Sequence, residues 1–169
     1  MVETLAWLKA TMPQHPFRLR IVGPTLTRDD VAYLAELRAL VGVRNLTPWV
    51  SFDGPMPMSQ LPEVYGSAFV HLNLSETGSM DKAILESLAC GCPTLTSNTA
   101  VFPLLADFKA LIVSDRTPEA IGAQICRTYE ERGSRSPLEL RQLVTGQHDL
   151  DSYTERVWRV LCELTERAA

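Results

Sequence analysis

The sequence predicts a Rossmann-like, doubly wound α/β domain, and two features of its apolar patterning carry this prediction. Short β-rich runs alternate with segments of helical periodicity about five times, and the connections between them are short. Several of the short runs are apolar without alternation, which is typical of parallel strands that are covered on both faces. We therefore expect about five parallel strands with flanking helices in one domain.

Each element is placed by its periodicity and by the residues that end it. The expected strands occupy residues 18–23, 48–54, 68–75, 93–97 and 110–114. The expected helices among them occupy residues 2–12, 28–42, 59–67, 81–90 and 118–132. Two more helices, 136–146 and 150–167, follow the last strand. The single domain, 1–169, thus has a core at about 18–130 and C-terminal helices at about 136–166, the last with an apolar stripe that must pack on something.

Composition excludes several classes of protein. A chain of 169 residues with 46% apolar composition suits one soluble globular domain with a single core. The net charge is −4 and the basic residues are scattered, so we expect no nucleic-acid partner. No apolar run approaches the ~20 residues of a transmembrane helix, and no signal pattern opens the chain, so we expect a cytoplasmic location. Neither the four cysteines nor the three histidines have the spacing of a metal site.

The junction that follows the expected strand 68–75 is the strongest candidate for chemistry. The chain has no G-x-G-x-x-G, P-loop or G-x-S-x-G motif, which disfavours dinucleotide, P-loop and α/β-hydrolase sites. Ligands of doubly wound sheets bind at the carboxyl ends of strands. Here Gly78 allows close backbone approach, Ser79 is expected to cap the next helix, and the free N–H groups of that helix suit a phosphate.

Lys82 and Glu86 are four residues apart on the expected helix 81–90 and share a face. One interpretation is a solvated ion pair that contributes ~0.3 kcal/mol. The other has Glu86 accepting hydrogen bonds from the two hydroxyls of a ribose, while Lys82 supplies a cation for phosphates. The helix alone leaves both interpretations open.

Five segments, in their order along the chain, resemble group 1 retaining glycosyltransferases. They are IVG (21–23), VSFDGPMPMSQLPEVYGSA (50–68), HLNLSETGS (71–79), LESLACGCPTLTSN (85–98) and LIVSDRTPEAIGAQI (111–125). The resemblance covers roughly residues 18–130, and L-E-x-x-A-C-G-x-P is its most specific part. Members of this family have two Rossmann-like domains in the GT-B arrangement, and this chain is similar to the C-terminal domain, which binds the nucleotide sugar.

The resemblance implies a role for Glu86. The family has a pair of acids separated by seven residues, and the second acid, which corresponds to Glu86, binds the donor ribose. Gly78 stands where the first acid would be. Glu76 and Asp81 are the nearby acids that would reach a sugar hydroxyl instead. The alternatives are an exposed loop acid for Glu76 and, for Asp81, an ordinary first-turn acid that the helix dipole favours.

The segment T-G-S-M-D-K is similar to a variant loop found in some members of the group. This resemblance implies that the backbone N–H groups of Ser79, Met80 and Asp81 face the diphosphate or the sugar. Gly23 and Gly54 resemble family positions whose backbones pass near the phosphate and the base respectively. Each of these two residues is equally well explained as a turn glycine.

The resemblance also implies what this chain lacks. Relative to the family, the first strand of the domain, the basic loop after it and the N-terminal, acceptor-binding domain are missing. In the strand order 3-2-1-4-5-6 the missing strand is central. We therefore expect the sheet either to pair the neighbours of the gap or to take a strand from elsewhere.

These features together predict the donor-binding half of a retaining hexosyltransferase, inactive as an isolated chain. The reaction would transfer a hexose from a nucleoside diphosphate sugar to a hydroxyl, with the nucleotide sugar as substrate and no cofactor or metal. The expected partners are the nucleotide sugar and either an N-terminal domain or a second copy. The alternative is a non-catalytic α/β module used for protein association, because fold alone does not fix function.

Overall fold

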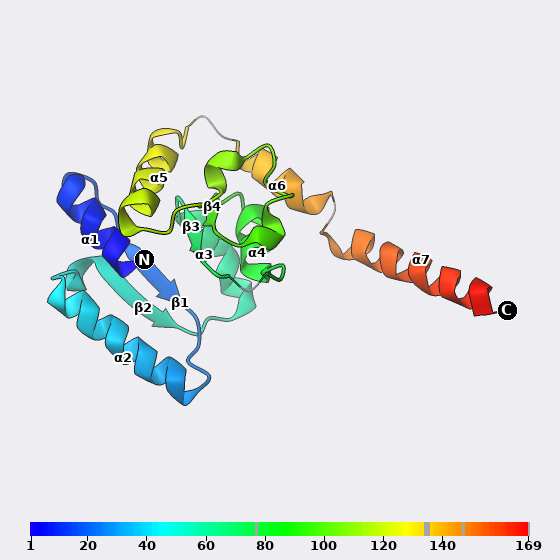
Figure 1. The fold of residues 1–169 in the computed structure, drawn as a ribbon, viewed down its shortest axis with the longest axis horizontal. Helices are drawn as coiled ribbons and strands as arrows, with labels where there is room; N and C mark the ends of the chain where they lie inside the picture. Colours follow the sequence, from blue (N-terminus) through cyan, green and yellow to red (C-terminus); the bar gives the residue numbers. More distant parts are fainter. Residues whose placement is uncertain (77, 134–135, 147, 169) are drawn as a thin grey trace.

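The structure is a computed structural model that describes residues 1–169 except 77, 134–135, 147 and 169. Strands and helices alternate as far as the fifth helix, which confirms the α/β class (Figure 1). The strands are β1 (Leu19–Val22), β2 (Val50–Gly54), β3 (His71–Asn73) and β4 (Thr94–Thr96). The helices are α1 (Val2–Thr11), α2 (Arg28–Val43), α3 (Leu61–Ser67), α4 (Lys82–Ala89), α5 (Pro118–Glu130), α6 (Pro137–Thr145) and α7 (Leu150–Ala168).

The parallel strands form two separate pairs. β1 pairs with β2, in a register that places Leu19 opposite Val50, and β3 pairs with β4, with His71 opposite Thr94. Both arrangements expected for the gap are therefore wrong for the described residues: no ladder joins β1 to β3, and no other strand lies between them. We call these two units the β1–β2 half and the β3–β4 half.

The fifth expected strand, 110–114, is shorter than predicted. It contributes one parallel bridge, between Ile112 and Thr96, and a 3-10 turn at Lys109–Leu111 precedes it. The side chain of Gln124 on α5 explains why the strand does not continue. Its Nε2 donates to the carbonyl oxygens of Ala110 at 2.6 Å and of Ile112 at 2.9 Å. These two backbone acceptors are thus satisfied by a side chain instead of by a neighbouring strand.

The two halves are buried to different extents. All three residues of β4 are fully buried, and so are Ile84 and Leu88 on the facing side of α4. By contrast, β1 has no buried residue, and Val41 is the one buried residue of α2. The densest part of the hydrophobic core therefore lies around β4 and α4.

A cluster of aromatic rings joins the halves where β1 and β3 begin. Phe17 precedes β1, Phe69 precedes β3, and their ring centroids are 5.5 Å apart. Tyr129 of α5 meets both rings edge-on, with centroid distances of 5.3 and 5.7 Å. Such tilted and edge-to-face pairs are the favoured aromatic geometry. The rings thus provide, between the starts of these strands, a contact that the backbone does not make.

Helix α1 packs on α5 with little space between the two backbones. A Cβ atom added to Gly122 of α5 would overlap the ring of Trp7 of α1. Glycine is therefore required here by packing and not by its backbone angles. This close contact fixes the N-terminal helix against the body of the domain.

The last helix, α7, extends away from the rest of the chain (Figure 1). Its apolar stripe is exposed to solvent and, among the described residues, does not pack on the rest of the chain. The exposed apolar residues are Tyr153, Val157, Trp158, Val160, Leu161 and Leu164. Among the described residues, no helix has both the length and the apolar character needed to span a membrane.

Candidate functional site

The candidate site lies where β3 and β4 end, on the loop that leads from β3 into α4. In doubly wound sheets this edge is where ligands bind. The sequence-predicted residues from Glu76 to Glu86 belong to this loop and to α4. Thr77, the first residue of the T-G-S-M-D-K segment, lies outside the described residues.

Asp81 is the N-cap of α4. Its Oδ1 accepts a hydrogen bond from the backbone N–H of Ala83 at 3.0 Å, and its Oδ2 accepts one from Nδ2 of Asn73 at 2.6 Å. The expectation that Ser79 caps this helix is therefore wrong, because the helix begins two residues later than that cap would require. A carboxylate has about four acceptor sites, so Asp81 keeps acceptor capacity for a ligand while it anchors the loop.

Asn98, which follows β4, fixes the loop through a side-chain hydrogen bond. It is fully buried, and its Nδ2 donates to the carbonyl oxygen of Ser79 at 2.9 Å. Its Oδ1 accepts from the N–H of Ala100 at 3.0 Å, and its own N–H donates to Oγ1 of Thr96 at 3.0 Å. The side-chain donors and acceptor of a buried asparagine are thus used to fix one position of the loop.

Asn73, at the end of β3, plays the same part on the other side of the loop. In addition to its bond to Asp81, its Oδ1 accepts a hydrogen bond from Oγ of Ser75 at 2.8 Å. Sequence reasoning missed both asparagines. For Asn73 a signal was available, because it is a polar residue at the end of an apolar strand and just before the candidate loop, whereas Asn98 acts on the loop from a distant segment.

Gly78 adopts a left-handed conformation with φ of 66°, and no atom lies within 4 Å of the place where its Cβ would be. The glycine is therefore required by the path of the loop and not by close packing. An acid at this position, as in the family pattern, would have to adopt the same strained conformation. The open space beside Gly78 leaves the loop backbone accessible.

Lys82 and Glu86 lie on successive turns of α4 but form no ion pair within the described part of the chain, which does not support the solvated-pair interpretation. Lys82 is exposed and Glu86 is half-buried. Burial, and next the negative charge of Glu86, raise the pKa of the Tyr65 phenol on α3 to about 12. The charge of Glu86 is therefore felt at Tyr65 on the neighbouring helix α3.

The two other predicted glycines lie on the β1–β2 half. Gly23 follows β1 and Gly54 ends β2, and the N–H of Gly23 donates to the carbonyl oxygen of Gly54 at 2.9 Å. Both have positive φ, at 152° and 68°. The structure thus brings these two residues together, on the sheet that does not carry the loop of residues 76–81.

Arg116, in the loop before α5, was also missed from the sequence. Its Nη2 lies 2.6 Å from Oε1 of Glu76, and its Nη1 donates to the carbonyl oxygen of Leu74 at 3.5 Å. The arginine therefore reaches from the segment after Ile112 to the end of β3. It adds a cation to the edge of the sheet where the loop lies.

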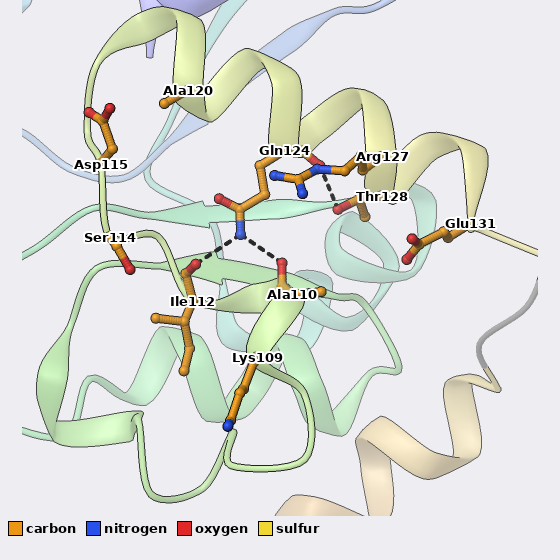
Figure 2. A pocket seen from close by; sticks show the side chains of 10 residues that line it. All are labelled: Lys109, Ala110, Ile112, Ser114, Asp115, Ala120, Gln124, Arg127, Thr128 and Glu131. Atoms are coloured by element: carbon orange, nitrogen blue, oxygen red, sulfur yellow. Dashed lines mark hydrogen bonds between the residues drawn. The ribbon is translucent and has the colours of Figure 1, made fainter.

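Two hollows in the surface of the described residues lie near this part of the fold. One, of about 310 Å³, lies between α5 and residues 109–115, and Figure 2 shows the Gln124 side chain directed from α5 towards the carbonyl groups that it binds. It contains none of the predicted site residues. The other, of about 710 Å³, is lined by Met80 together with residues of 100–108 and α6. Met80 is thus the predicted residue that borders a hollow, and it does so on the side towards α6.

Metal-ligating side chains do not gather at the site. Among the residues that the structure describes, no three His, Cys, Asp or Glu side chains come close enough to hold a metal ion. The four cysteines are free thiols, and burial raises the pKa of Cys92. The groups available to a ligand are therefore backbone N–H groups, carboxylates and two cationic side chains.

Comparisons with known proteins find similarity in sequence and in fold. Over 99 residues the chain is 26% identical to the O-antigen chain mannosyltransferase B of Escherichia coli, an alignment that covers 59% of this chain and 26% of the relative. The fold is similar to that of the sucrose-phosphate synthase from Thermosynechococcus elongatus, with a TM-score of 0.80 and 22% identity. That likeness covers 98% of this chain and 42% of the synthase.

The chain thus spans less than half the length of each of these two proteins. The family model described as glycosyl transferases group 1 matches residues 1–131, which is more than half of the chain. This match confirms the resemblance that the sequence motifs indicate. The chain belongs to the group 1 glycosyltransferases.

Proposed function

We propose that this chain is the donor-binding half of a retaining hexosyltransferase. The observation that carries the proposal is the loop after β3, which Asp81 and Asn98 fix through short hydrogen bonds at the start of α4. A binding loop that buried polar groups fix through hydrogen bonds is preorganised, so little conformational entropy is lost when a ligand binds.

Each predicted residue has a task in this proposal. Glu86, half-buried and not neutralised by Lys82, accepts hydrogen bonds from the two ribose hydroxyls of the donor. Lys82, exposed at the first position of α4, contributes a positive charge towards the diphosphate.

The loop and the glycines complete the donor site. The backbone N–H groups of Ser79, Met80 and Asp81 face the diphosphate or the sugar, because a helix N-terminus favours anions. Gly23 and Gly54 let the backbone pass close to the phosphate and the base. Asp81 or Glu76 would contact a sugar hydroxyl.

The proposal assigns donor binding, and not a complete reaction, to this chain. Transfer of a hexose to a hydroxyl requires a second substrate and strong stabilisation of the leaving diphosphate. The described residues supply candidate groups for the donor alone. We therefore expect binding of a nucleotide without turnover when the chain is studied by itself.

Calorimetric titration with UDP, GDP and ADP tests the proposal. We expect one of the three to bind to the chain and Glu86→Ala to abolish that binding, because each hydrogen bond to a carboxylate contributes about 1.5–3 kcal/mol. Glu36→Ala is the matched control, since Glu36 is an exposed helical glutamate on α2 and belongs to the other half. Absence of binding by any nucleotide at millimolar concentration would contradict the proposal.

A second candidate function, protein association, is favoured by the exposed apolar stripe of α7. Monomeric soluble proteins rarely expose a large contiguous apolar patch, and such patches often mark interaction sites. Sedimentation of the chain and of a Val157→Glu, Leu161→Glu double variant tests this function. A concentration-dependent oligomer that the double variant loses would support association, and a monomer at all concentrations would count against self-association.

A further inference from the structure

The loop that precedes α5 presents Arg116 in a fixed position. The carboxylate of Asp115 accepts a hydrogen bond from the N–H of Thr117 at 2.9 Å, and the hydroxyl of Thr117 caps α5. The backbone on the C-terminal side of Arg116 is therefore well determined. From this base its guanidinium reaches the carbonyl oxygen of Leu74 and the carboxylate of Glu76.

These contacts place Arg116 at the edge of the sheet that carries the candidate donor loop. Leu74 directly follows Asn73, whose amide holds Asp81 at the start of α4. Arg116, the end of β3 and the N-terminus of α4 are thus connected through two consecutive residues. Lys82, at the start of α4, and Arg116 thus both bring a cationic side chain to this end of the β3–β4 half.

The ion pair between Arg116 and Glu76 is poorly suited to a purely structural task. Its side chains are 44% and 70% exposed, so water and salt compete with the pair and it adds little to stability. The same exposure makes the pair easy to exchange for another anion. A guanidinium binds phosphate with the same paired donors that it offers to a carboxylate.

We propose that Arg116 binds a phosphate group of the donor, and that the Glu76 carboxylate holds this arginine until the phosphate takes its place. This inference rests on the proposed function for the identity of the ligand, which is a nucleoside diphosphate. It adds to the site a cation from the loop before α5. It also gives Glu76 the role of an internal competitor instead of a sugar ligand.

A structural role of the ion pair and the proposed role predict opposite changes in ligand affinity when Glu76 loses its charge. If the ion pair only stabilises the conformation of the loop, removal of either partner makes the loop less ordered, and both variants bind the ligand more weakly. If Glu76 competes with phosphate for Arg116, removal of its charge strengthens binding, whereas removal of the arginine weakens it. The direction of the Glu76 effect therefore separates the two roles.

The experiment measures binding of UDP, GDP, ADP and inorganic pyrophosphate by calorimetry. For Arg116→Gln we expect binding about ten- to a hundredfold weaker, the range that one charge-assisted hydrogen bond supports. For Glu76→Gln we expect binding about two- to fivefold tighter, because an exposed pair is a weak competitor. Circular dichroism of each variant checks that the fold is retained.

A matched control is available on the other side of the molecule. Arg44 and Glu3 form an ion pair at 2.8 Å whose side chains are 49% and 38% exposed, and this pair joins α2 to α1, away from the loop. Arg44→Gln and Glu3→Gln should leave the affinity for every probe unchanged. An equal loss in Arg44→Gln and Arg116→Gln would show a general effect of net charge and would overturn the inference.

The remaining outcomes distinguish the inference from the proposed function. Nucleotide binding that needs Glu86 but not Arg116 would keep the function and overturn the inference, and so would weaker binding in both Arg116→Gln and Glu76→Gln. Pyrophosphate binding with the expected opposite signs, without binding of any nucleotide, would keep the phosphate site and overturn the nucleotide-sugar function. Failure of all four probes to bind would overturn both.

Discussion

The β3–β4 half and the β1–β2 half are built from the same kind of parallel pair, yet one is a packed core and the other is a thin layer. Every residue of β4 is buried, and α4 covers it with two fully buried side chains, Ile84 and Leu88. In the β1–β2 half, β1 has no buried residue and α2 has one. The candidate donor loop belongs to the packed half, where rigid neighbours can position its polar groups.

The predicted site residues also differ in how firmly neighbouring residues hold them in place. Asp81 and the backbone around Gly78 and Ser79 are held by buried asparagines. The N–H of Gly23 donates to the carbonyl oxygen of Gly54 where the β1–β2 ladder ends, and β1 has no buried side chain. We infer that the loop of residues 78–81 in the proposed site is preformed, while the part of that site at Gly23 and Gly54 is less restrained.

The largest expected effect is a loss of stability when a leucine is shortened to alanine, and we compare one leucine from each half. Leu88→Ala on α4 should lower the free energy of unfolding by about 2–5 kcal/mol, because it empties a fully buried position next to β4. Leu37→Ala on α2, which is half-buried, should cost less than half as much. Urea denaturation of both variants gives the two values. Equal losses would show that the exposed appearance of the β1–β2 half does not reflect its contribution to stability.

A smaller effect is expected from the polar groups under the loop. Asn98→Leu keeps the approximate shape of the side chain but leaves the carbonyl of Ser79 and the N–H of Ala100 without their partner. We expect a loss of about 1–3 kcal/mol in the free energy of unfolding. Hydrogen exchange at Gly78, Ser79 and Met80 should accelerate, since the loop loses its support.

Asp53 provides the comparison for this prediction in the other half. It lies in β2 directly before Gly54, and its carboxylate forms an ion pair with Arg20 at 2.7 Å. This arginine lowers the pKa of the Asp53 carboxyl through its hydrogen bond. Asp53→Leu should cost no more than about 1 kcal/mol, as expected for a partly exposed ion pair. A larger loss at Asp53 than at Asn98 would reverse the ranking of the two halves.

The sequence predicts the class of the fold and most of its elements for a clear physical reason. Apolar periodicity records which faces are buried, and it placed α2, α4 and α5 to within a few residues. The short fifth strand was not predictable in the same way. Gln124 lies fourteen positions from Ala110, and no local pattern shows that its amide would occupy the carbonyl groups of that strand.

The candidate site shows the same limit. Glu86 and the loop could be found from a motif, because the motif is contiguous in the sequence. Asn98 and Arg116 could not, since each acts on the loop through a contact between distant segments. The separation of β1 from β3 also depends on tertiary packing, because the rings of Phe17 and Phe69 meet where a strand would otherwise be required.

The last expected effect is a dependence of stability on pH that arises from His71 in β3. Burial lowers its pKa from 6.5 to about 4, and the nearby charge of Asp81 opposes this shift without cancelling it. Tyr65 lies edge-on to the ring at 5.4 Å, and Oγ1 of Thr94 lies 3.3 Å from Nδ1. The ring is therefore neutral in the folded protein at pH 5, whereas the unfolded chain binds a proton there.

The sign follows from this difference in bound protons. The contribution of His71 to stability is complete above pH 6.5, and it is lost as the pH falls towards about 4, where the folded protein takes up the proton too. Between pH 7 and pH 5 we expect the free energy of unfolding to fall by about 1–2 kcal/mol from this group. His71→Gln is the control, because it cannot titrate and should have a flatter profile of thermal midpoint against pH over this interval. If the two profiles are parallel, His71 is accessible to water in the folded state, and the packing of the β3–β4 half is looser at β3 than at β4.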